Sequence, residues 1–218
     1  MKAYLISGLG ADSRIFAKLA LPSHIEISHI EWITPNSGEK LSDYAARLSN
    51  AIDTKRPFIL IGVSFGGMLA VEIAKIFKPI LTIIISSTIY SKHLPLTYRI
   101  VGRLNLTQFI PSSLFKSANK FTQNFFFGTK TKQEKKLLKT IVNDTDPMFL
   151  KWAISSIVTW QNQTRPENLH LIHGKADRIL YSKQSKPDFW IEEGTHFMVY
   201  QKADQISKII SELVSGIR

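Results

Sequence analysis

A serine that could act as a nucleophile lies in residues 62–66, which read Gly-Val-Ser-Phe-Gly and centre on Ser64. The apolar run 58–61 precedes this segment, and a helical pattern over 68–75 follows it. A G-x-S-x-G sequence between a strand and a helix is typical of a sharp turn, the nucleophile elbow, that lifts a serine hydroxyl above a sheet. The glycines leave room for the turn, and the helix N-terminus adds N–H donors beside the hydroxyl. We predict that Ser64 is a nucleophile; the alternative is an ordinary glycine-rich turn.

A serine nucleophile needs a base, and the base needs an acid that orients it. Residues 169–174 have the pattern of a buried strand, and Asp177 follows that strand. A second short strand is expected to begin at residues 189–191, and it runs into a glycine-flanked loop that contains His196. The sequence therefore predicts that Asp177 is the acid and His196 the base for Ser64.

Other residues could fill these two roles. Five further histidines are weaker candidates for the base. His170 and His173 lie in or at the end of a predicted strand, and we expect them to be structural. We expect His24 and His29, which flank an early strand, at the surface or a sheet edge, and His93 lies in a basic region. Glu192 and Glu193 are alternatives to Asp177, but both lie too near His196 in sequence to orient it easily from a separate strand. The segment 86–90, after the strand that follows the elbow helix, contains no carboxylate. Asp177 is therefore the preferred acid.

Together these motifs resemble those of the α/β-hydrolase superfamily. The resemblance rests on SGLGAD at 7–12, GVSFGG at 62–67, HGKADRI at 173–179 and EGTHF at 193–197. It covers nearly the whole chain and includes the order Ser, Asp, His that is known for this fold. It implies an α/β-hydrolase fold with a catalytic triad, but it says almost nothing about the substrate, because this fold supports many reactions.

Acyl transfer also needs hydrogen-bond donors for the oxyanion that forms on the substrate. The backbone N–H of Phe65, which follows the nucleophile, is the first expected donor. The resemblance implies that the N–H of Leu9, in the loop 7–12, is the second. Members of the superfamily usually have His-Gly where this chain has Ser-Gly, which changes the support of the loop but keeps the backbone donor. The alternative is a tight turn that needs its glycines; Gly8 and Gly10 do not fit a G-x-G-x-x-G dinucleotide fingerprint.

The alternation of apolar runs and helical patterns predicts an α/β fold with a mostly parallel sheet of about six strands flanked by helices. The expected strands lie near 3–7, 25–30, 58–63, 81–86, 168–173 and 188–192. The expected helices of the core lie near 12–20, 41–54, 65–77 and 201–215.

The alternation stops between residues 89 and 165, where the pattern predicts helices near 97–107, 112–125, 131–143 and 147–161. The resemblance implies a helical cap at this place, inserted into a core formed by 1–88 and 166–218. The insertion contains many large aromatic residues: Phe109, Phe115, Phe121, Phe125, Phe126, Phe127, Phe149, Trp152 and Trp160. Most should pack the cap onto the core. Trp152, Trp160 and Phe125 are our candidates for lining a substrate pocket, and Trp152 and Trp160 share a helix face with Ser156.

Composition limits the class of protein. The 218 residues include no cysteine, which excludes disulfides and thiolate metal sites. The histidines show no metal-ligand spacing, so we expect no metal and no cofactor. No apolar stretch approaches the roughly 18 residues of a membrane span. The expected protein is soluble and cytoplasmic.

Positive charge is concentrated in the insertion. Residues 89–140 contain ten lysines and arginines against one glutamate, which gives +9 of the chain's net charge of +11. Such charge can simply be a solvated surface, or it can attract an anionic partner such as an acyl-carrier protein, the phosphates of coenzyme A or anionic lipid headgroups. We expect no nucleic acid, because no binding motif accompanies the charge.

The sequence therefore predicts a small serine hydrolase that cleaves an ester or thioester through an acyl-enzyme. Two alternatives remain open: a lyase or C–C hydrolase of the same fold, and a ligand receptor or signalling protein with little turnover.

Overall fold

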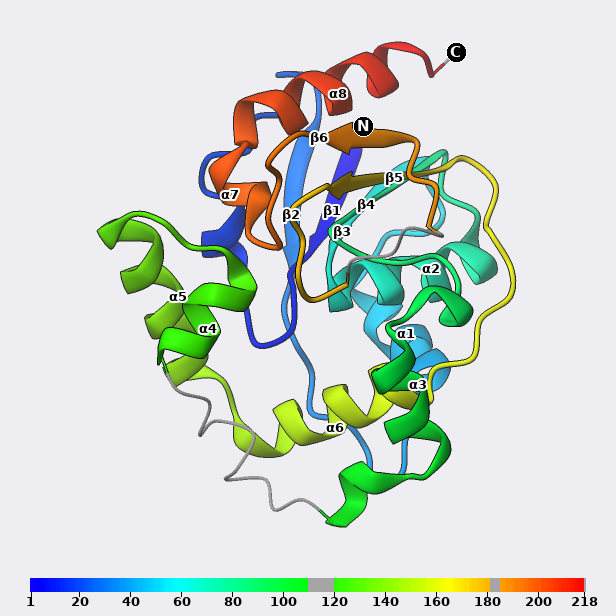
Figure 1. Cartoon of the computed structure of the whole chain (residues 1–218). Helices are drawn as coiled ribbons and strands as arrows, with labels where there is room; N and C mark the ends of the chain where they lie inside the picture. Colours follow the sequence, from blue (N-terminus) through cyan, green and yellow to red (C-terminus); the bar gives the residue numbers. More distant parts are fainter. Residues whose placement is uncertain (110–119, 181–184, 218) are drawn as a thin grey trace.

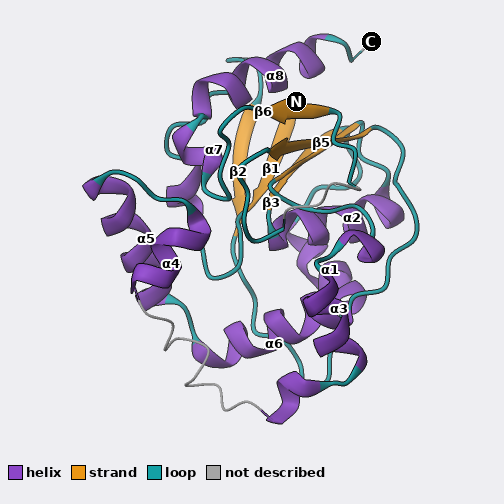
Figure 2. Ribbon diagram, in the orientation of Figure 1, coloured by secondary structure: helices purple, strands orange, loops and turns teal. Residues whose placement is uncertain are grey.

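The computed structural model describes residues 1–109, 120–180 and 185–217, and within them one sheet of six strands (Figures 1 and 2). The strands are β1 Lys2–Ile6, β2 Glu26–Ile30, β3 Phe58–Val63, β4 Leu81–Ile85, β5 Leu169–Gly174 and β6 Phe189–Ile191. Their order is β2-β1-β3-β4-β5-β6, and all neighbours are parallel. The predicted fold class, an α/β fold with about six strands, is confirmed.

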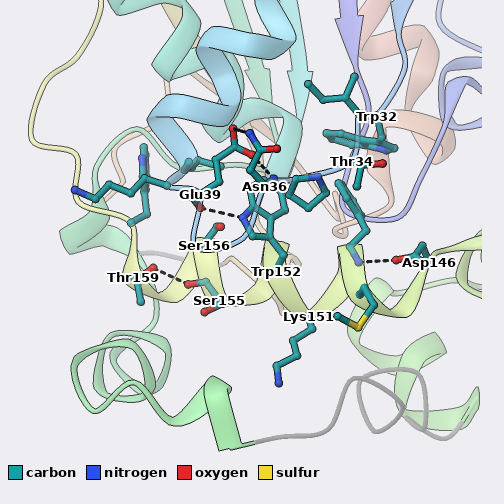
Figure 3. Close-up of a pocket in the computed structure, with 18 of the residues that line it drawn as sticks. Trp32, Thr34, Asn36, Glu39, Asp146, Lys151, Trp152, Ser155, Ser156 and Thr159 are labelled. Carbon is teal, nitrogen blue, oxygen red and sulfur yellow. Dashed lines mark hydrogen bonds between the residues drawn. The ribbon is translucent and has the colours of Figure 1, made fainter.

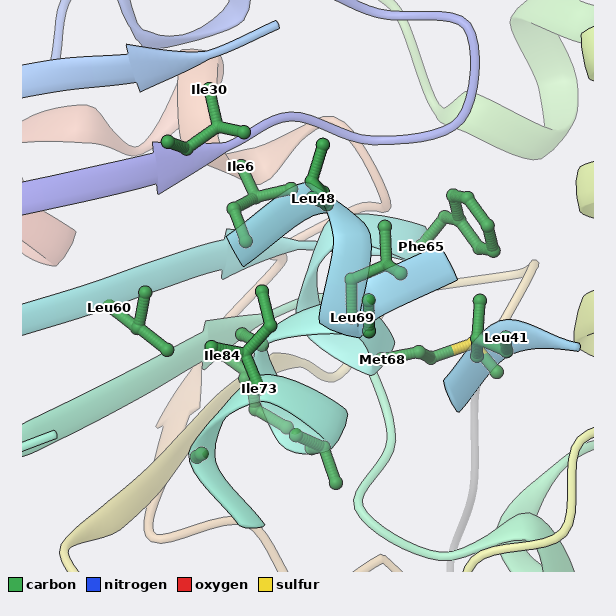
Figure 4. Packing of buried hydrophobic residues seen from close by; sticks show 14 of the residues in the cluster. Ile6, Ile30, Leu41, Leu48, Leu60, Phe65, Met68, Leu69, Ile73 and Ile84 are labelled. Atoms are coloured by element: carbon green, nitrogen blue, oxygen red, sulfur yellow. The ribbon is translucent and has the colours of Figure 1, made fainter. Parts of the chain in front are cut away.

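The central strands are apolar along their whole length because helices cover both faces of the sheet. All residues of β3 and β4 are buried. On one face, Leu60 and Ile84 pack against α1 Leu41–Leu48 and α2 Phe65–Phe77 (Figure 4). On the other face, Ile59 and Ile83 pack against α7 Met198–Gln201 and α8 Ala203–Ser215. Alternate residues of one strand thus serve two cores.

The prediction of a helix over 12–20 is wrong: the structure has only the 3-10 turn η1 Ser13–Phe16. After this turn, the N–H of Leu19 donates to the carbonyl of Phe16. The N–H of Ala20 donates to the Ser207 hydroxyl of α8 and not to a carbonyl of its own segment, so no helix continues. In place of the single helix predicted over 41–54, the structure has the shorter helix α1, which ends at Leu48, followed directly by the 3-10 turn η2 Ser49–Ala51.

The described residues between β4 and β5 are mostly helical. Their elements are η3 Ser91–His93, α3 Leu96–Arg103, η4 Leu106–Phe109, α4 Lys120–Phe127, α5 Lys132–Asp144 and α6 Pro147–Thr159. Two of these helices have N-caps formed by side chains. Thr131 forms a capping box with Glu134 at the start of α5, and Asp146 accepts from the N–H of Phe149 at the start of α6. Most of the helix predicted over 112–125, with Phe115, lies outside the described residues. The described helices gather beyond the carboxyl ends of the strands (Figure 1).

Candidate active site

Ser64 lies in a strained turn between β3 and α2. Its φ of 53° and ψ of −116° are rarely adopted by residues with a side chain. The flanking glycines make this turn fit: a Cβ on Gly62 would lie 2.4 Å from the carbonyl oxygen of Gly66, and a Cβ on Gly66 would lie 2.2 Å from that of Ser7. The Ser87 hydroxyl donates to the carbonyl of Ser64 at 2.7 Å. The turn therefore holds Ser64 in one defined, half-buried position.

The three residues predicted for catalysis meet at this turn, although they come from three distant loops. Oγ of Ser64 lies 2.9 Å from Nε2 of His196, and Nδ1 of His196 lies 2.8 Å from Oδ2 of Asp177. Asp177 follows β5, whereas His196 lies between β6 and α7. Both His196 and Asp177 are buried. Three parallel strands of one sheet, β3, β5 and β6, thus bring a hydroxyl, a carboxylate and an imidazole into one hydrogen-bonded chain.

The second oxygen of Asp177 is held by the backbone. Its Oδ1 accepts from the N–H of Ile179 at 2.8 Å and from that of Leu180 at 3.1 Å. Burial by itself raises the pKa of Asp177, but the charge and hydrogen bond of His196, the nearby His173 and the N–H of Ile179 bring that pKa below its usual value. Asp177 is therefore a fixed carboxylate that can orient His196.

The two alternative acids point elsewhere. Glu192 and Glu193 are exposed and pair with lysines, Glu192 with Lys175 and Glu193 with Lys202. Neither carboxylate bonds to His196, whose Nδ1 faces Asp177. The geometry therefore favours Asp177 over both glutamates.

The loop 7–12 lies directly beside the nucleophile. A Cβ placed on Gly8 would lie 3.5 Å from Cβ of Ser64. In the part of the chain that the structure describes, neither the N–H of Leu9 nor that of Phe65 donates to another protein group. Two backbone donors predicted for an oxyanion are thus left available to a ligand.

Ser7, in place of the histidine that the resemblance in motifs implies, supports this loop. Its hydroxyl donates to the carbonyl of Ala11 at 2.6 Å, and the N–H of Ala11 donates to the carbonyl of Gly8 at 2.9 Å. The buried serine therefore supplies the hydrogen bond that closes the turn.

A second histidine lies behind the acid. His173, at the end of β5, is fully buried, and its Nε2 lies 3.7 Å from Oδ2 of Asp177. Its ring packs edge-on against Trp190, with 6.0 Å between the ring centres. Burial lowers the pKa of His173, and the nearby Asp177 offsets only part of that effect. His173 is thus a neutral imidazole beside the carboxylate, consistent with the structural role expected for it.

One aromatic residue of the insertion touches the base. The ring of Phe127, at the end of α4, lies 5.6 Å from the ring of His196 in an edge-to-face arrangement. The carbonyl of Phe127 also accepts from the N–H of Phe197 at 3.3 Å. Nothing in the sequence distinguishes Phe127 from the other phenylalanines of the insertion, since its role depends on a contact across about 70 residues of chain.

A cavity of about 1620 Å³ lies between α6 and residues 32–42 (Figure 3). Trp152, predicted for the substrate pocket, lines it. Its Nε1 donates to the carbonyl of Glu39 at 2.9 Å, and its ring lies 4.4 Å from Tyr44 and 5.9 Å from Phe65. Because Phe65 follows Ser64, Trp152 links the cavity wall to the nucleophile turn.

Trp32 is a lining residue that sequence reasoning missed. Its Nε1 donates to the carbonyl of Ala11 at 2.7 Å, and its ring lies 5.8 Å from Phe65 and 5.2 Å from Phe149. It follows β2 in a segment without a motif, so only its contacts reveal it. Through Ala11, Trp32 connects the cavity to the loop 7–12.

The other two predicted pocket residues lie in different surroundings. Trp160 is buried at one end of the cavity, where its Nε1 donates to Glu72 at 2.8 Å; Glu72 also pairs with Lys75 at 2.7 Å. Phe125 is not among the described residues that line the cavity. Its half-exposed ring instead lies 4.1 Å from the guanidinium of Arg178.

Among the described residues, no group of three or more histidine, aspartate or glutamate side chains could hold a metal ion. Within the same residues, no helix has both the length and the apolar character needed to cross a membrane.

Comparison with known proteins gives matches in structure but not in sequence. No protein-family model matches the chain, and no curated protein sequence matches it significantly. A thermophilic esterase matches with a TM-score of 0.70 and 11% identity over 99% of this chain and 90% of that one. ClbQ from the colibactin NRPS/PKS pathway matches with a TM-score of 0.64 and 13% identity, over 99% and 97%. RedJ-thioesterase from the prodiginine pathway of Streptomyces coelicolor matches with a TM-score of 0.65 and 11% identity, over 98% and 90%.

Proposed function

The chain has the α/β-hydrolase fold, as the resemblance of its motifs predicted, and we propose that it is a serine hydrolase of esters or thioesters. One observation carries this proposal: the hydrogen-bonded chain from Ser64 through His196 to Asp177, with steps of 2.9 and 2.8 Å. A hydroxyl becomes a strong nucleophile when an oriented imidazole can take its proton. That esterases and thioesterases share the fold agrees with this chemistry, although fold alone does not assign it.

In the proposed reaction, Oγ of Ser64 bonds to the acyl carbon while Nε2 of His196 takes the hydroxyl proton. Asp177 keeps the other ring proton on Nδ1 and stabilises the imidazolium. The N–H groups of Leu9 and Phe65 bind the oxyanion. His196 then gives its proton to the departing alcohol or thiol, which leaves an acyl-enzyme. Water, deprotonated by His196, releases the acid and restores Ser64.

We place part of the substrate in the cavity between α6 and residues 32–42. The ring centres of Trp32 and Trp152 both lie within 6 Å of that of Phe65, the neighbour of Ser64, which makes these two rings the candidates for contact with an apolar group on the acyl carbon. Both indole N–H groups already donate to backbone carbonyls, which leaves ring faces and edges for the ligand. Residues 89–165 then act as a cap; the contact of Phe127 with His196 supports this assignment.

The test is labelling with a fluorophosphonate together with turnover of an ester and thioester panel. We expect one covalent label per chain and many turnovers. Ser64→Ala should abolish the label and lower kcat by roughly 10⁴–10⁶-fold. Ser211→Ala, at a serine of α8 whose hydroxyl donates only within its own helix, serves as the control and should still be labelled. A label that persists in Ser64→Ala refutes the proposal. One slow turnover per chain favours a receptor, and labelling without ester cleavage favours a lyase or C–C hydrolase.

A partner is proposed at the basic side of α5, whose exposed lysines could attract an anionic acyl carrier or coenzyme A: Lys132, Lys135, Lys136 and Lys139. Exposed charges act over a Debye length of about 8–10 Å near physiological salt. Added salt should therefore lower kcat/KM for a carrier or coenzyme A thioester and leave a neutral p-nitrophenyl ester unchanged. Replacing the four lysines with glutamate should have the effect of high salt on the charged substrates alone. An equal salt response for all substrates would contradict this partner.

A further inference from the structure

Helix α3 carries an apolar stripe on its outer side. Leu96, Ile100 and Leu104 recur every four residues and therefore share one face. Their side chains are 63%, 48% and 59% exposed. Exposed apolar residues that lie singly are common, but a contiguous row of them marks a surface that contacts something else.

The side of α3 opposite this stripe packs against α6, and this contact determines which way the stripe faces. A Cβ placed on Gly102 would lie 1.8 Å from the carbonyl oxygen of Val158, so α3 lies against α6 at this residue. Each residue of a helix turns by about 100°, which puts Gly102 about 200° from Ile100. The apolar stripe thus faces away from α6, and it cannot pack against α6 unless α3 turns on its axis.

The apolar exposure continues into η4, which is also held on α6. Leu106 and Phe109 are 41% and 75% exposed. The hydroxyls of Thr107 and Ser155 lie 2.9 Å apart, and Nζ of Lys151 donates to the carbonyl of Gln108 at 3.2 Å. We call Leu96, Ile100, Leu104, Leu106 and Phe109 the α3–η4 apolar surface.

Cations border this surface. Arg99 and Arg103 are exposed, and they lie on α3 between the side of Gly102 and the side of Leu96. With Lys92 they line a shallow cavity of about 540 Å³ between α3 and the end of α6. No acidic residue occurs between residues 89 and 109. Among the described residues, none of these three cations forms an ion pair, and together they surround a hollow next to exposed apolar side chains.

We propose that the α3–η4 apolar surface docks on an anionic lipid membrane. The apolar side chains enter the boundary between headgroups and acyl chains, and the hollow with Lys92, Arg99 and Arg103 receives a headgroup phosphate. Apolar residues beside lysine and arginine are what a helix needs to lie in a lipid interface. The stripe is on the convex outer side of α3, which suits a broad lipid surface, whereas a folded carrier protein would need a matching shape.

The test is flotation of the whole chain with phosphatidylcholine vesicles that contain or lack phosphatidylglycerol. We expect the chain to bind the anionic vesicles, to bind the neutral vesicles weakly, and to lose binding as salt is added. Changing Arg99 and Arg103 together to glutamine should weaken partitioning by about tenfold or more, because each cation near an anionic surface adds about 1 kcal/mol. Ile100→Ser should weaken it independently of salt.

Matched controls decide whether α3 is responsible. Ile76→Ser removes an isoleucine of α2 with similar exposure, 51%, and Lys135 with Lys139 changed to glutamine removes two charges of α5. Both controls should keep the binding of the unmodified chain. Hydrolysis of a neutral soluble ester and the melting temperature verify that each variant is folded.

Several outcomes would overturn the proposal. If the α5 variant loses vesicle binding as strongly as the α3 variants, the attraction comes from net charge and not from this surface. If an acyl-carrier protein binds through Ile100 while vesicles do not, the surface is a protein interface. Dimerisation that Ile100→Ser abolishes, without vesicle binding, would assign the surface to a second copy. If inorganic phosphate alone displaces the chain from the vesicles, the hollow is a phosphate site and the apolar side chains do not contribute to binding.

Discussion

The two carboxylate oxygens of Asp177 have different roles: one is bound by the backbone, and the other orients His196. Oδ1 accepts backbone N–H groups of the loop after β5, and Oδ2 faces Nδ1 of His196. Replacing one oxygen therefore need not disturb the other. The contact with His173 at 3.7 Å lies on the Oδ2 side as well, so the environment of this oxygen is formed by two imidazoles.

We predict that Asp177→Asn folds but lowers kcat by roughly 10³–10⁴-fold. The asparagine can keep its oxygen on the backbone donors and turn its NH₂ toward His196, which favours the tautomer that cannot accept the proton of Ser64. Melting temperature and kcat on the same ester measure the two effects separately. Glu192→Gln and Glu193→Gln are the controls, since both carboxylates are exposed. A fully active Asp177→Asn beside an inactive glutamate variant would assign the acid elsewhere.

At the scale of elements, the nucleophile turn depends on close approach of α2 to β1. A Cβ on Gly66 would lie 2.2 Å from the carbonyl oxygen of Ser7 and 2.4 Å from that of Ile6, both of them backbone atoms. Backbone cannot rotate away as a flexible side chain can. The spacing between α2 and β1 therefore sets both the stability of the core and the position of Ser64.

We predict that Gly66→Ala lowers the free energy of unfolding by about 1–3 kcal/mol, the usual cost of overpacking, and also lowers kcat. Gly216→Ala is the matched control because its nearest atoms lie 3.5 Å away or more and its φ is −80°. Chemical denaturation gives the stability, and ester hydrolysis gives the rate. If the two alanine variants behave alike, the close approach does not constrain the turn.

Local patterns explain which elements the sequence could predict. The strand over 58–63 is one continuous apolar run followed by a short motif, so a few neighbouring residues are enough to predict both its bounds and the position of Ser64. The helix over 12–20 failed because the hydroxyl of Ser207, almost 190 residues away, takes the N–H of Ala20. The cavity could not be predicted either: Trp152 meets Glu39 across 113 residues, and no short window contains both.

At the scale of the whole molecule, positive charge lies on two separate sides of the insertion. The lysines of α5 and the arginines of α3 belong to helices that lie apart (Figure 1). The exposed residues of α5 are polar, whereas α3 has exposed apolar residues. The two sides therefore suit different anionic partners, and charge changes on each can be tested with the other as its control.

Buried titratable groups tie the stability of the whole fold to pH. The pKa of His173 is lowered in the folded chain because the ring is buried. An unfolded histidine takes a proton near pH 6.5, so below that pH the unfolded chain binds more protons and the folded state loses stability. Asp177 acts in a lower window: its pKa is also lowered, so the stability it contributes is present above about pH 4 and is lost as the pH falls further.

We predict that the melting temperature of the unmodified chain falls between about pH 7.5 and 5, and that His173→Phe falls less over the same interval. The phenylalanine has similar size beside Trp190 but cannot take a proton in the unfolded state. The measured quantity is the change with pH, so a constant loss of stability in His173→Phe does not affect the comparison. His24→Gln, at an exposed site, is the control and should follow the unmodified chain. Parallel curves for the unmodified chain and His173→Phe would show that protonation of this buried ring does not set the acid sensitivity of the fold.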